Sequence, residues 1–180
     1  EYKNGNSRWD LIDLARLCYA LRPDGIEWPM HEAGKPSFRL EDLTAANGIE
    51  HRGAHDALAD VRATIALARL IMKSQPRLFE WGLQMRKQAE VMRLLDPTDP
   101  KPLLHTRSRV PATRGCTAMV LPLAVMPDRP KSVVVFDLSA DPEPLFTEPA
   151  DVLHDLVFTP ADSMPDGIER LPLNLVHRNH

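Results

Sequence analysis

The chain has 180 residues, a formal net charge of −3 at pH 7 and 43% hydrophobic residues. This composition excludes an intrinsically disordered chain, and the length suits one domain of ordinary size or two small ones. The chain has no apolar run near the roughly 20 residues that span a bilayer, and it does not open on a signal segment, so we expect a cytoplasmic protein without a membrane partner. Cys18 and Cys116 lie far apart without a C-x-x-C spacing, which predicts buried thiols and no zinc site.

The first 50 residues predict two helices and an ordered loop. Ser7-Arg8-Trp9-Asp10 fits a capping box that starts the first helix, and Pro23 with Gly25 ends it. The apolar residues that recur on one face of this helix are Leu11, Leu14, Cys18 and Leu21. Residues 22–38 lack periodicity and predict an ordered loop, and a short helix follows from about Leu40 to Asn47, with Gly48 as its stop.

Two longer helices are predicted next. The first runs from about Ala57 to Lys73, with Asp56 as its N-cap. The residues expected on its core face are Ala57, Val61, Ile65, Ala68 and Met72. The second covers about Leu78 to Leu95.

Proline marks a change in the chain, because only 3 of the 17 prolines occur before residue 76 and 13 occur after residue 96. The later part predicts strands over Thr117–Val125, Ser132–Leu138 and Leu171–Val176, with Asp128-Arg129-Pro130-Lys131 as a turn and a short helix over Ala150–Leu156. Frequent prolines confine strands to short or edge positions, which suits a small barrel.

Charge is unevenly distributed along the chain. Residues 76–114 carry 8 basic and 4 acidic side chains, whereas residues 115–180 carry 4 basic and 10 acidic ones. The basic middle segment is a candidate surface for phosphate or acidic peptides, and a solvated helix face is an equally good interpretation of charge alone.

The most informative motif is Gly53-Ala54-His55-Asp56-Ala57-Leu58-Ala59-Asp60. Residues five apart inside one helix point about 140° apart, so His55 and Asp60 share a site only if His55 precedes the helix and Asp60 lies in its first turns. A helix N-terminus favours an ionised carboxylate there. On spacing alone, a loop histidine and a surface aspartate explain the motif as well.

The residues around this motif carry a family resemblance. The segments are Asn6–Leu11, Ala20–Pro29, Pro36–Thr44, Ala46–His51, Gln75–Phe79, Lys101–Leu103, Arg114–Gly115 and Pro122–Ala124. In this order they resemble bacterial exonuclease I, a single-strand DNA exonuclease of the DEDDh superfamily. The resemblance implies an α+β fold in two parts. Residues 1–75 are expected to be the C-terminal, mostly helical part of a ribonuclease H-like exonuclease domain, and residues 76–180 a linker helix and a small Src-homology-3-like β-barrel.

The resemblance also implies roles for site residues. The family binds two magnesium ions with four carboxylates, of which this sequence shows one, Asp60, as metal ligand, with His55 as general base. Phe38 and Arg39 are expected to contact single-stranded DNA by stacking and phosphate pairing, with core and surface roles as the alternatives. Three further residues are expected to bind the acidic C-terminal tail of single-stranded DNA-binding protein, namely Arg22, Trp81 and Lys101.

These features predict a fragment of a monomeric 3′–5′ exodeoxyribonuclease that releases mononucleotides in DNA repair and recombination. The fragment is expected to be weak or inactive alone, because it lacks the upstream carboxylates. Two alternatives stay open: an oligoribonuclease or proofreading exonuclease of the same superfamily, and a non-catalytic module that binds DNA or single-stranded DNA-binding protein.

Overall fold

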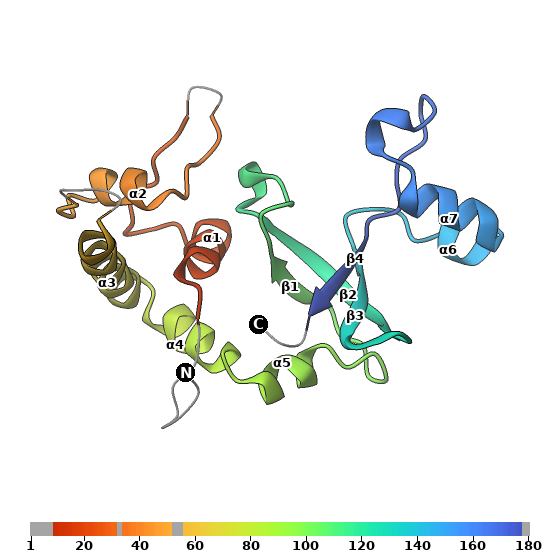
Figure 1. Ribbon diagram of the computed structural model, residues 1–180, viewed down its shortest axis with the longest axis horizontal. Helices are drawn as coiled ribbons and strands as arrows, with labels where there is room; N and C mark the ends of the chain where they lie inside the picture. The colour runs from red at the N-terminus through yellow and green to blue at the C-terminus, as the bar shows by residue number, and fades with distance from the viewer. Residues whose placement is uncertain (1–8, 32–33, 52–55, 178–180) are drawn as a thin grey trace. The chain divides into compact units, whose positions relative to one another are not determined.

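The computed structural model describes residues 9–31, 34–51 and 56–177 (Figure 1). These residues form two compact units, which are described separately: the first takes in residues 9–90 and 105–117, and the second residues 91–104 and 118–177. Among the described residues, none of the helices is both long and apolar enough to cross a membrane.

The first unit is built mainly from four helices, α1 (Leu11–Leu21), α2 (Leu40–Ala46), α3 (Ala57–Ser74) and α4 (Pro76–Met85). Helix α1 begins after Asp10, whose carboxylate accepts a hydrogen bond from the backbone N–H of Ile12 at 3.0 Å. The predicted start at a capping box is therefore wrong, because Asp10 itself is the N-cap and Trp9 lies outside the helix. Ser7 lies outside the described residues.

Helix α3 begins at the predicted residue and ends one residue beyond the predicted end. Its predicted cap is confirmed, since the carboxylate of Asp56 accepts from the backbone N–H of Ala59 at 3.0 Å. The predicted core face is wrong. The buried residues are Ala63, Leu67 and Ile71, whereas the predicted core residues Val61, Ile65 and Met72 are 54%, 46% and 48% exposed. Apolar residues occupy two stripes of this helix, and periodicity alone does not say which stripe meets the core.

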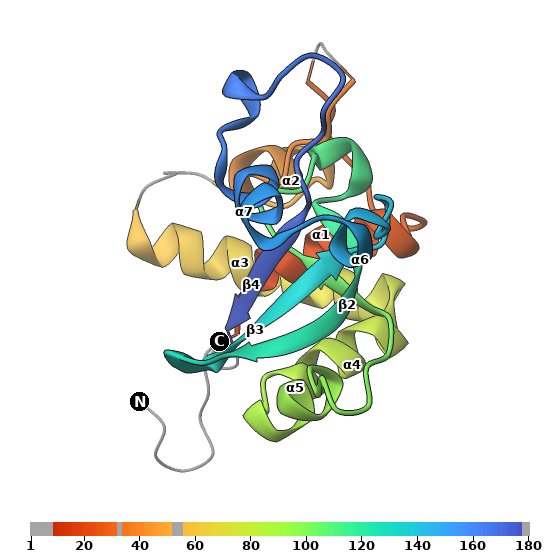
Figure 2. The same ribbon diagram turned by 90° about the vertical axis from the view of Figure 1, so that its right-hand side faces the viewer.

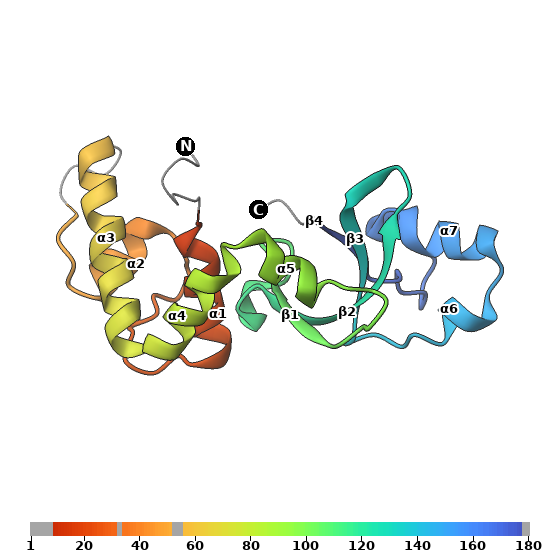
Figure 3. The same ribbon diagram turned by 90° about the horizontal axis from the view of Figure 1, so that it is seen from below.

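The core of the first unit lies where α3 meets its neighbours. Leu67 and Ile71 pack in one cluster with Leu14 and Cys18 of α1 and Leu43 of α2. Helix α3 contacts α1, α2 and α4. Figure 3 shows α2 and α4 beside it.

Helix α4 packs closely on α1 through a glycine. A Cβ placed on Gly82 would lie 3.0 Å from a methyl group of Leu14 and 3.1 Å from the ring of Trp9. The single predicted helix over Leu78–Leu95 is wrong, because α4 ends at Met85 and a separate helix, α5, covers Gln88–Leu94. Neither glycine nor proline stands at this break, and local sequence does not explain it.

The second unit contains most of a four-stranded sheet in the order β1 (Leu103–Thr106), β2 (Thr117–Met126), β3 (Arg129–Asp137) and β4 (Leu173–His177). Strands β2, β3 and β4 lie side by side in Figure 2, and both pairs are antiparallel. The side chains that build its core are Val120, Val133, Val135 and Phe136. Strands β2 and β4 confirm the prediction within two residues, whereas β1 was not predicted.

Two prolines lie inside strands, and each lies at a local irregularity. Pro122 is buried in β2 beside a register shift between β2 and β3, and Pro130 lies at the exposed start of β3 next to a second shift. Proline removes one ladder hydrogen bond, so a bulge or a strand end accommodates it. The predicted turn at residues 128–131 is therefore too long, because β3 already begins at Arg129.

The connection from β3 to β4 is helical. It carries α6 (Pro144–Thr147), α7 (Ala150–Phe158) and the short 3₁₀ turn η3 (Ala161–Ser163). The predicted helix from Ala150 is confirmed and extends two residues further, to Phe158, whereas α6 was not predicted.

The two stripes of α3 give a matched pair of substitutions. Ile71 is fully buried and Ile65 is 46% exposed. We expect Ile71→Ala to lower the free energy of unfolding by about 2–5 kcal/mol, because it removes buried methyl groups and leaves a cavity. Ile65→Ala should change it by less than about 1 kcal/mol. Urea unfolding of the two variants checks this, and equal losses would contradict the assigned core face.

Candidate functional site

The candidate site lies at the N-terminus of α3. Asp60 is in the first turn of this helix, and its side chain is 42% exposed. One carboxylate oxygen, Oδ1, lies 2.8 Å from Nε2 of His51. An ionised carboxylate only accepts hydrogen bonds, so Nε2 is the donor in this contact. Helix N-terminal N–H groups carry partial positive charge, and they favour the ionised form of a carboxylate placed there.

His51 comes from the connection between α2 and α3 and is nearly enclosed, with a side-chain exposure of 6%. Its other ring nitrogen, Nδ1, lies 3.4 Å from Oγ1 of Thr44, a fully buried residue of α2. The Thr44 hydroxyl contacts the carbonyl of Leu40 at 2.8 Å, which places it against its own helix. The ring of His51 therefore links α2 to the first turn of α3.

Sequence reasoning did not assign a role to His51. His51 lies nine positions before Asp60 and precedes the helix, so no helical period relates the two. His55, the predicted partner of Asp60, lies outside the described residues. The prediction that His55 and Asp60 share a site therefore stays a prediction.

Asp60 fits a magnesium site as one ligand, because hard divalent cations take carboxylate oxygens and this carboxylate reaches the surface. Among the residues that the structure describes, no group of three or more His, Cys, Asp or Glu side chains is placed to hold a metal ion. A complete site would need further carboxylates, in agreement with the single ligand found in the sequence.

Phe38 and Arg39 differ sharply in exposure. Phe38 is 8% exposed, and its ring meets Tyr19 and Trp28 edge to face, at 5.6 and 6.3 Å between ring centroids. The guanidinium of Arg16 lies 5.9 Å from the centre of the Phe38 ring. This packing favours the core alternative for Phe38. Arg39 is 68% exposed beside Glu41, which leaves most of its side chain open to solvent.

The three predicted partner-binding residues lie on separate elements. Arg22 follows α1 and donates from Nη1 to the Leu21 carbonyl at 2.7 Å, and Trp81 on α4 is 41% exposed. Lys101 is 76% exposed and pairs with Asp99 at 2.7 Å. Arg22 and Trp81 belong to the first unit and Lys101 to the second, so their expected common surface stays a prediction.

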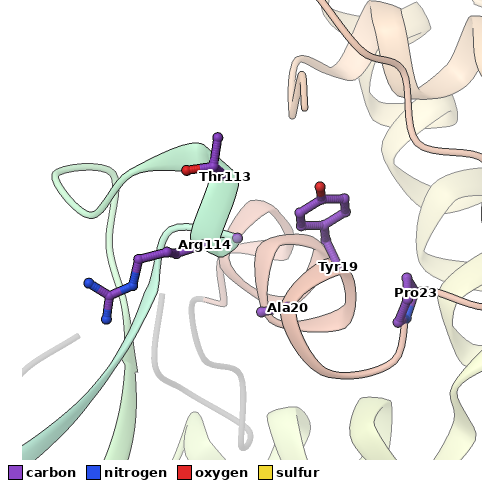
Figure 4. Close-up of a pocket in the computed structure, with 6 residues that line it drawn as sticks. Tyr19, Ala20, Pro23, Thr113 and Arg114 are labelled. Carbon is purple, nitrogen blue, oxygen red and sulfur yellow. The ribbon is translucent and has the colours of Figure 1, made fainter. Parts of the chain in front are cut away.

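A small open pocket of about 300 Å³ lies between the end of α1 and the 3₁₀ turn η2 (Ala112–Arg114). Figure 4 shows Tyr19 and Thr113 at this pocket, with the Arg114 side chain directed away from Tyr19. The turn comes very close to the helix, because a Cβ on Gly115 would lie 2.6 Å from Cβ of Ala20. The backbone N–H groups of residues 114–116 already donate to the carbonyls of residues 111 and 112. The turn therefore does not present them to an anion.

Both cysteines are buried, which confirms the prediction. Burial raises the pKa of the Cys18 thiol to about 12. Burial also raises the pKa of the Cys116 thiol, partly opposed by the charge of Arg16. Both therefore stay protonated near neutral pH, and neither is a reactive thiolate.

The chain is an α+β protein with a carboxylate at a helix N-terminus and a small antiparallel sheet. Comparison with known proteins defines its family. The model of the exonuclease I SH3-like domain family matches residues 86–180. The chain belongs to this family. It is 47% identical over 178 residues to exodeoxyribonuclease I of Escherichia coli K12. This match covers 99% of this chain and 37% of that protein.

Solved structures of exonuclease I match over almost the whole chain. E. coli exonuclease I in complex with a dA16 oligonucleotide superposes with a TM-score of 0.91 at 46% identity, and exonuclease I from Methylocaldum szegediense with a TM-score of 0.90 at 52% identity. Each match covers 99% of this chain and 38% of the solved chain. These matches confirm the expected fold class, with a helical part followed by an SH3-like domain.

Two further exonuclease I structures, the second of them from E. coli, bear on ligands of relatives. One is a complex with an SSB C-terminal peptide, at a TM-score of 0.87 and 45% identity, and the other is a zinc-bound form of the enzyme with single-stranded DNA, at 0.88 and 46%. They cover 99% of this chain and 38% of each solved chain. The chain thus spans well under half the length of its relatives.

His105 of β1 is partly buried. Burial, and secondarily the charge of Arg107, lowers its pKa from about 6.5 to about 4. The folded chain thus keeps His105 neutral where the unfolded chain binds a proton, so stability falls as pH drops from about 6.5 to about 4.

Over this range we expect the wild-type chain to lose about 2–3 kcal/mol more unfolding free energy than His105→Gln, whose amide does not titrate. Urea unfolding at pH 7 and pH 4.5 measures the difference. Parallel pH profiles for the two proteins would show that His105 titrates alike in the folded and unfolded states.

Proposed function

We propose that this chain is part of a 3′–5′ exodeoxyribonuclease that removes mononucleotides from single-stranded DNA, with a role in DNA repair and recombination. The observation that carries this proposal is the Asp60 carboxylate at the N-terminus of α3, held by His51, in a chain 47% identical to E. coli exodeoxyribonuclease I. A relative bound to a dA16 oligonucleotide supports the substrate class.

In this proposal Asp60 and His55 have different tasks. Asp60 contributes a carboxylate ligand, and His55 takes the proton from the attacking water, a task suited to a side chain with an unperturbed pKa of about 6.5. Magnesium ions, when bound, would stabilise the charge that develops on the phosphodiester oxygens. Because no three His, Cys, Asp or Glu side chains among the described residues are grouped to hold a metal ion, we expect this chain alone to be weak or inactive as a nuclease.

The remaining assignments belong to the same proposal. Residues 1–75 are part of the exonuclease domain, and residues 76–180 comprise the linker helix and the SH3-like domain. Arg39 pairs with a DNA phosphate, which its 68% side-chain exposure permits. Phe38 supports the adjacent loop through its ring contacts, and any base stacking by Phe38 stays a prediction. The protein acts as a monomer in the cytoplasm, a reducing compartment in which both buried thiols remain unpaired.

A second candidate is a non-catalytic module that binds single-stranded DNA-binding protein or DNA. One observation favours it: a relative is known in complex with an SSB C-terminal peptide. An oligoribonuclease or proofreading exonuclease fits less well, because the family match lies in the SH3-like domain.

The exonuclease proposal is tested in a hybrid enzyme, in which this chain replaces the matching segment of E. coli exodeoxyribonuclease I. We expect the hybrid to digest 5′-labelled single-stranded DNA from its 3′ end in the presence of Mg²⁺. His55→Ala and Asp60→Asn should each slow digestion by roughly 10²–10⁴-fold, since a positioned base and a metal ligand act in the chemical step.

Asp56→Asn is the matched control, because asparagine also caps a helix, and it should retain most of the activity. Equal loss in all three variants would indicate a structural effect, and preference for short RNA would favour the oligoribonuclease alternative. An inactive hybrid that still binds DNA would favour the binding module.

The partner assignment predicts that the chain binds an acidic peptide with an apolar C-terminal end and a free carboxylate. Trp81→Ala should weaken binding about tenfold or more, because an exposed ring is the apolar anchor. Lys101→Glu should weaken binding most at low salt, where charge attraction is least screened. Fluorescence anisotropy with a labelled peptide measures both, and Lys131→Glu, at an exposed position of β3, is the control. Equal effects of the two charge reversals would argue against a specific surface.

A further inference from the structure

We propose that His51 is a positioning residue that fixes the orientation of the Asp60 carboxylate for catalysis, an inference that rests on the proposed exonuclease function. The contact that carries it is the 2.8 Å hydrogen bond from Nε2 of His51 to Oδ1 of Asp60. His51 acts through Asp60 and is not assigned a contact with substrate or with the scissile phosphate.

The burial of the two partners is unequal, and this distinguishes the pair from an ordinary surface ion pair. The His51 side chain is 6% exposed, whereas the Asp60 side chain is 42% exposed. An exposed pair of flexible side chains holds its geometry weakly, because both partners lose conformational freedom for a small gain. Here the donor is held by the protein interior, so the acceptor is the partner whose orientation the contact sets.

The side chain of Thr44 lies on the other side of the His51 ring from Asp60. Its Nδ1 lies 3.4 Å from Oγ1 of Thr44, which is fully buried in α2. Thr44 Oγ1 lies 2.8 Å from the Leu40 carbonyl and 3.0 Å from the Glu41 carbonyl. A continuous set of contacts thus runs from the backbone of α2 through Thr44 and His51 to the first turn of α3.

Such a contact is compatible with metal coordination. A carboxylate has two oxygens with about four lone-pair directions in total, so the same carboxylate can accept hydrogen bonds and coordinate a metal ion. Partners that hydrogen-bond a ligating side chain fix its plane, and their loss typically costs about 10–100-fold in metal affinity or activity. The alternative role for His51 is purely structural: its contact with Asp60 only holds the connection before α3 against the helix.

The test compares His51→Ala and His51→Gln in the hybrid enzyme defined above. We expect His51→Ala to lower kcat by about 10–100-fold and to weaken Mn²⁺ binding by a similar factor, with the KM for single-stranded DNA within about twofold of wild type. His51→Gln, whose side-chain amide can donate at the same place, should recover much of both losses. Electron paramagnetic resonance of free Mn²⁺ gives the affinity without relying on turnover.

Two controls separate positioning from stability. His154→Ala removes a histidine of α7 that is 67% exposed and should leave kcat and Mn²⁺ affinity unchanged. In the Asp60→Asn background, His51→Ala should have little further effect on either quantity, because the group through which it acts is already altered.

The outcomes divide clearly. If His51→Ala lowers only the urea midpoint and leaves kcat and Mn²⁺ affinity at wild-type values, the role of His51 is purely structural and the inference is overturned. If the hybrid is inactive, the proposed function fails, and the Mn²⁺ titrations alone decide the role of His51. Absence of measurable Mn²⁺ binding in the wild-type hybrid overturns the inference as well.

Discussion

The burial of one face of α3 is the constraint on which the described part of the first unit depends. Leu67 and Ile71 pack with Leu14 and Cys18 of α1 and with Leu43 of α2, and together they form its apolar cluster. Burial of such side chains is the dominant favourable term in folding, and it fixes how α3 is turned about its own axis. The direction in which its first turn presents Asp60 follows from this packing.

Polar contacts at the start of α3 add to the orientation that core packing gives this helix. Asp56 caps the free N–H of Ala59, and Asp60, also in the first turn of the helix, contacts His51. The two aspartates have separate tasks: one satisfies the backbone, and the other lies near the positive end of the helix with its carboxylate 42% exposed. The helix cap therefore uses the Asp56 carboxylate, and the candidate site uses the Asp60 carboxylate four residues later.

The features that were predictable from sequence are those decided by local chemistry. Asp56 as a cap and Gly48, with a positive φ of 64°, as a helix stop are read from single residues. The core face of α3 was not predictable, because its second apolar stripe, which includes Val61 and Ile65, has the same period as the buried one. The contact between His51 and Asp60 joins residues on either side of a helix start, and no periodic pattern encodes it. Strand β1 has only four residues and a mostly half-buried pattern, too little for a strand signal.

The packing of α3 has a consequence for sequence change far from the candidate site. A carboxylate at the rim of a helix lies about 6 Å from the axis, so a turn of the helix by about 20° would displace it by roughly 2 Å. Ile71 lies three helical turns from Asp60. A substitution that changes how its side chain packs would rotate the whole helix, and this rotation would displace the Asp60 carboxylate. Impaired function without unfolding is thus the expected signature of mild core substitutions in this helix.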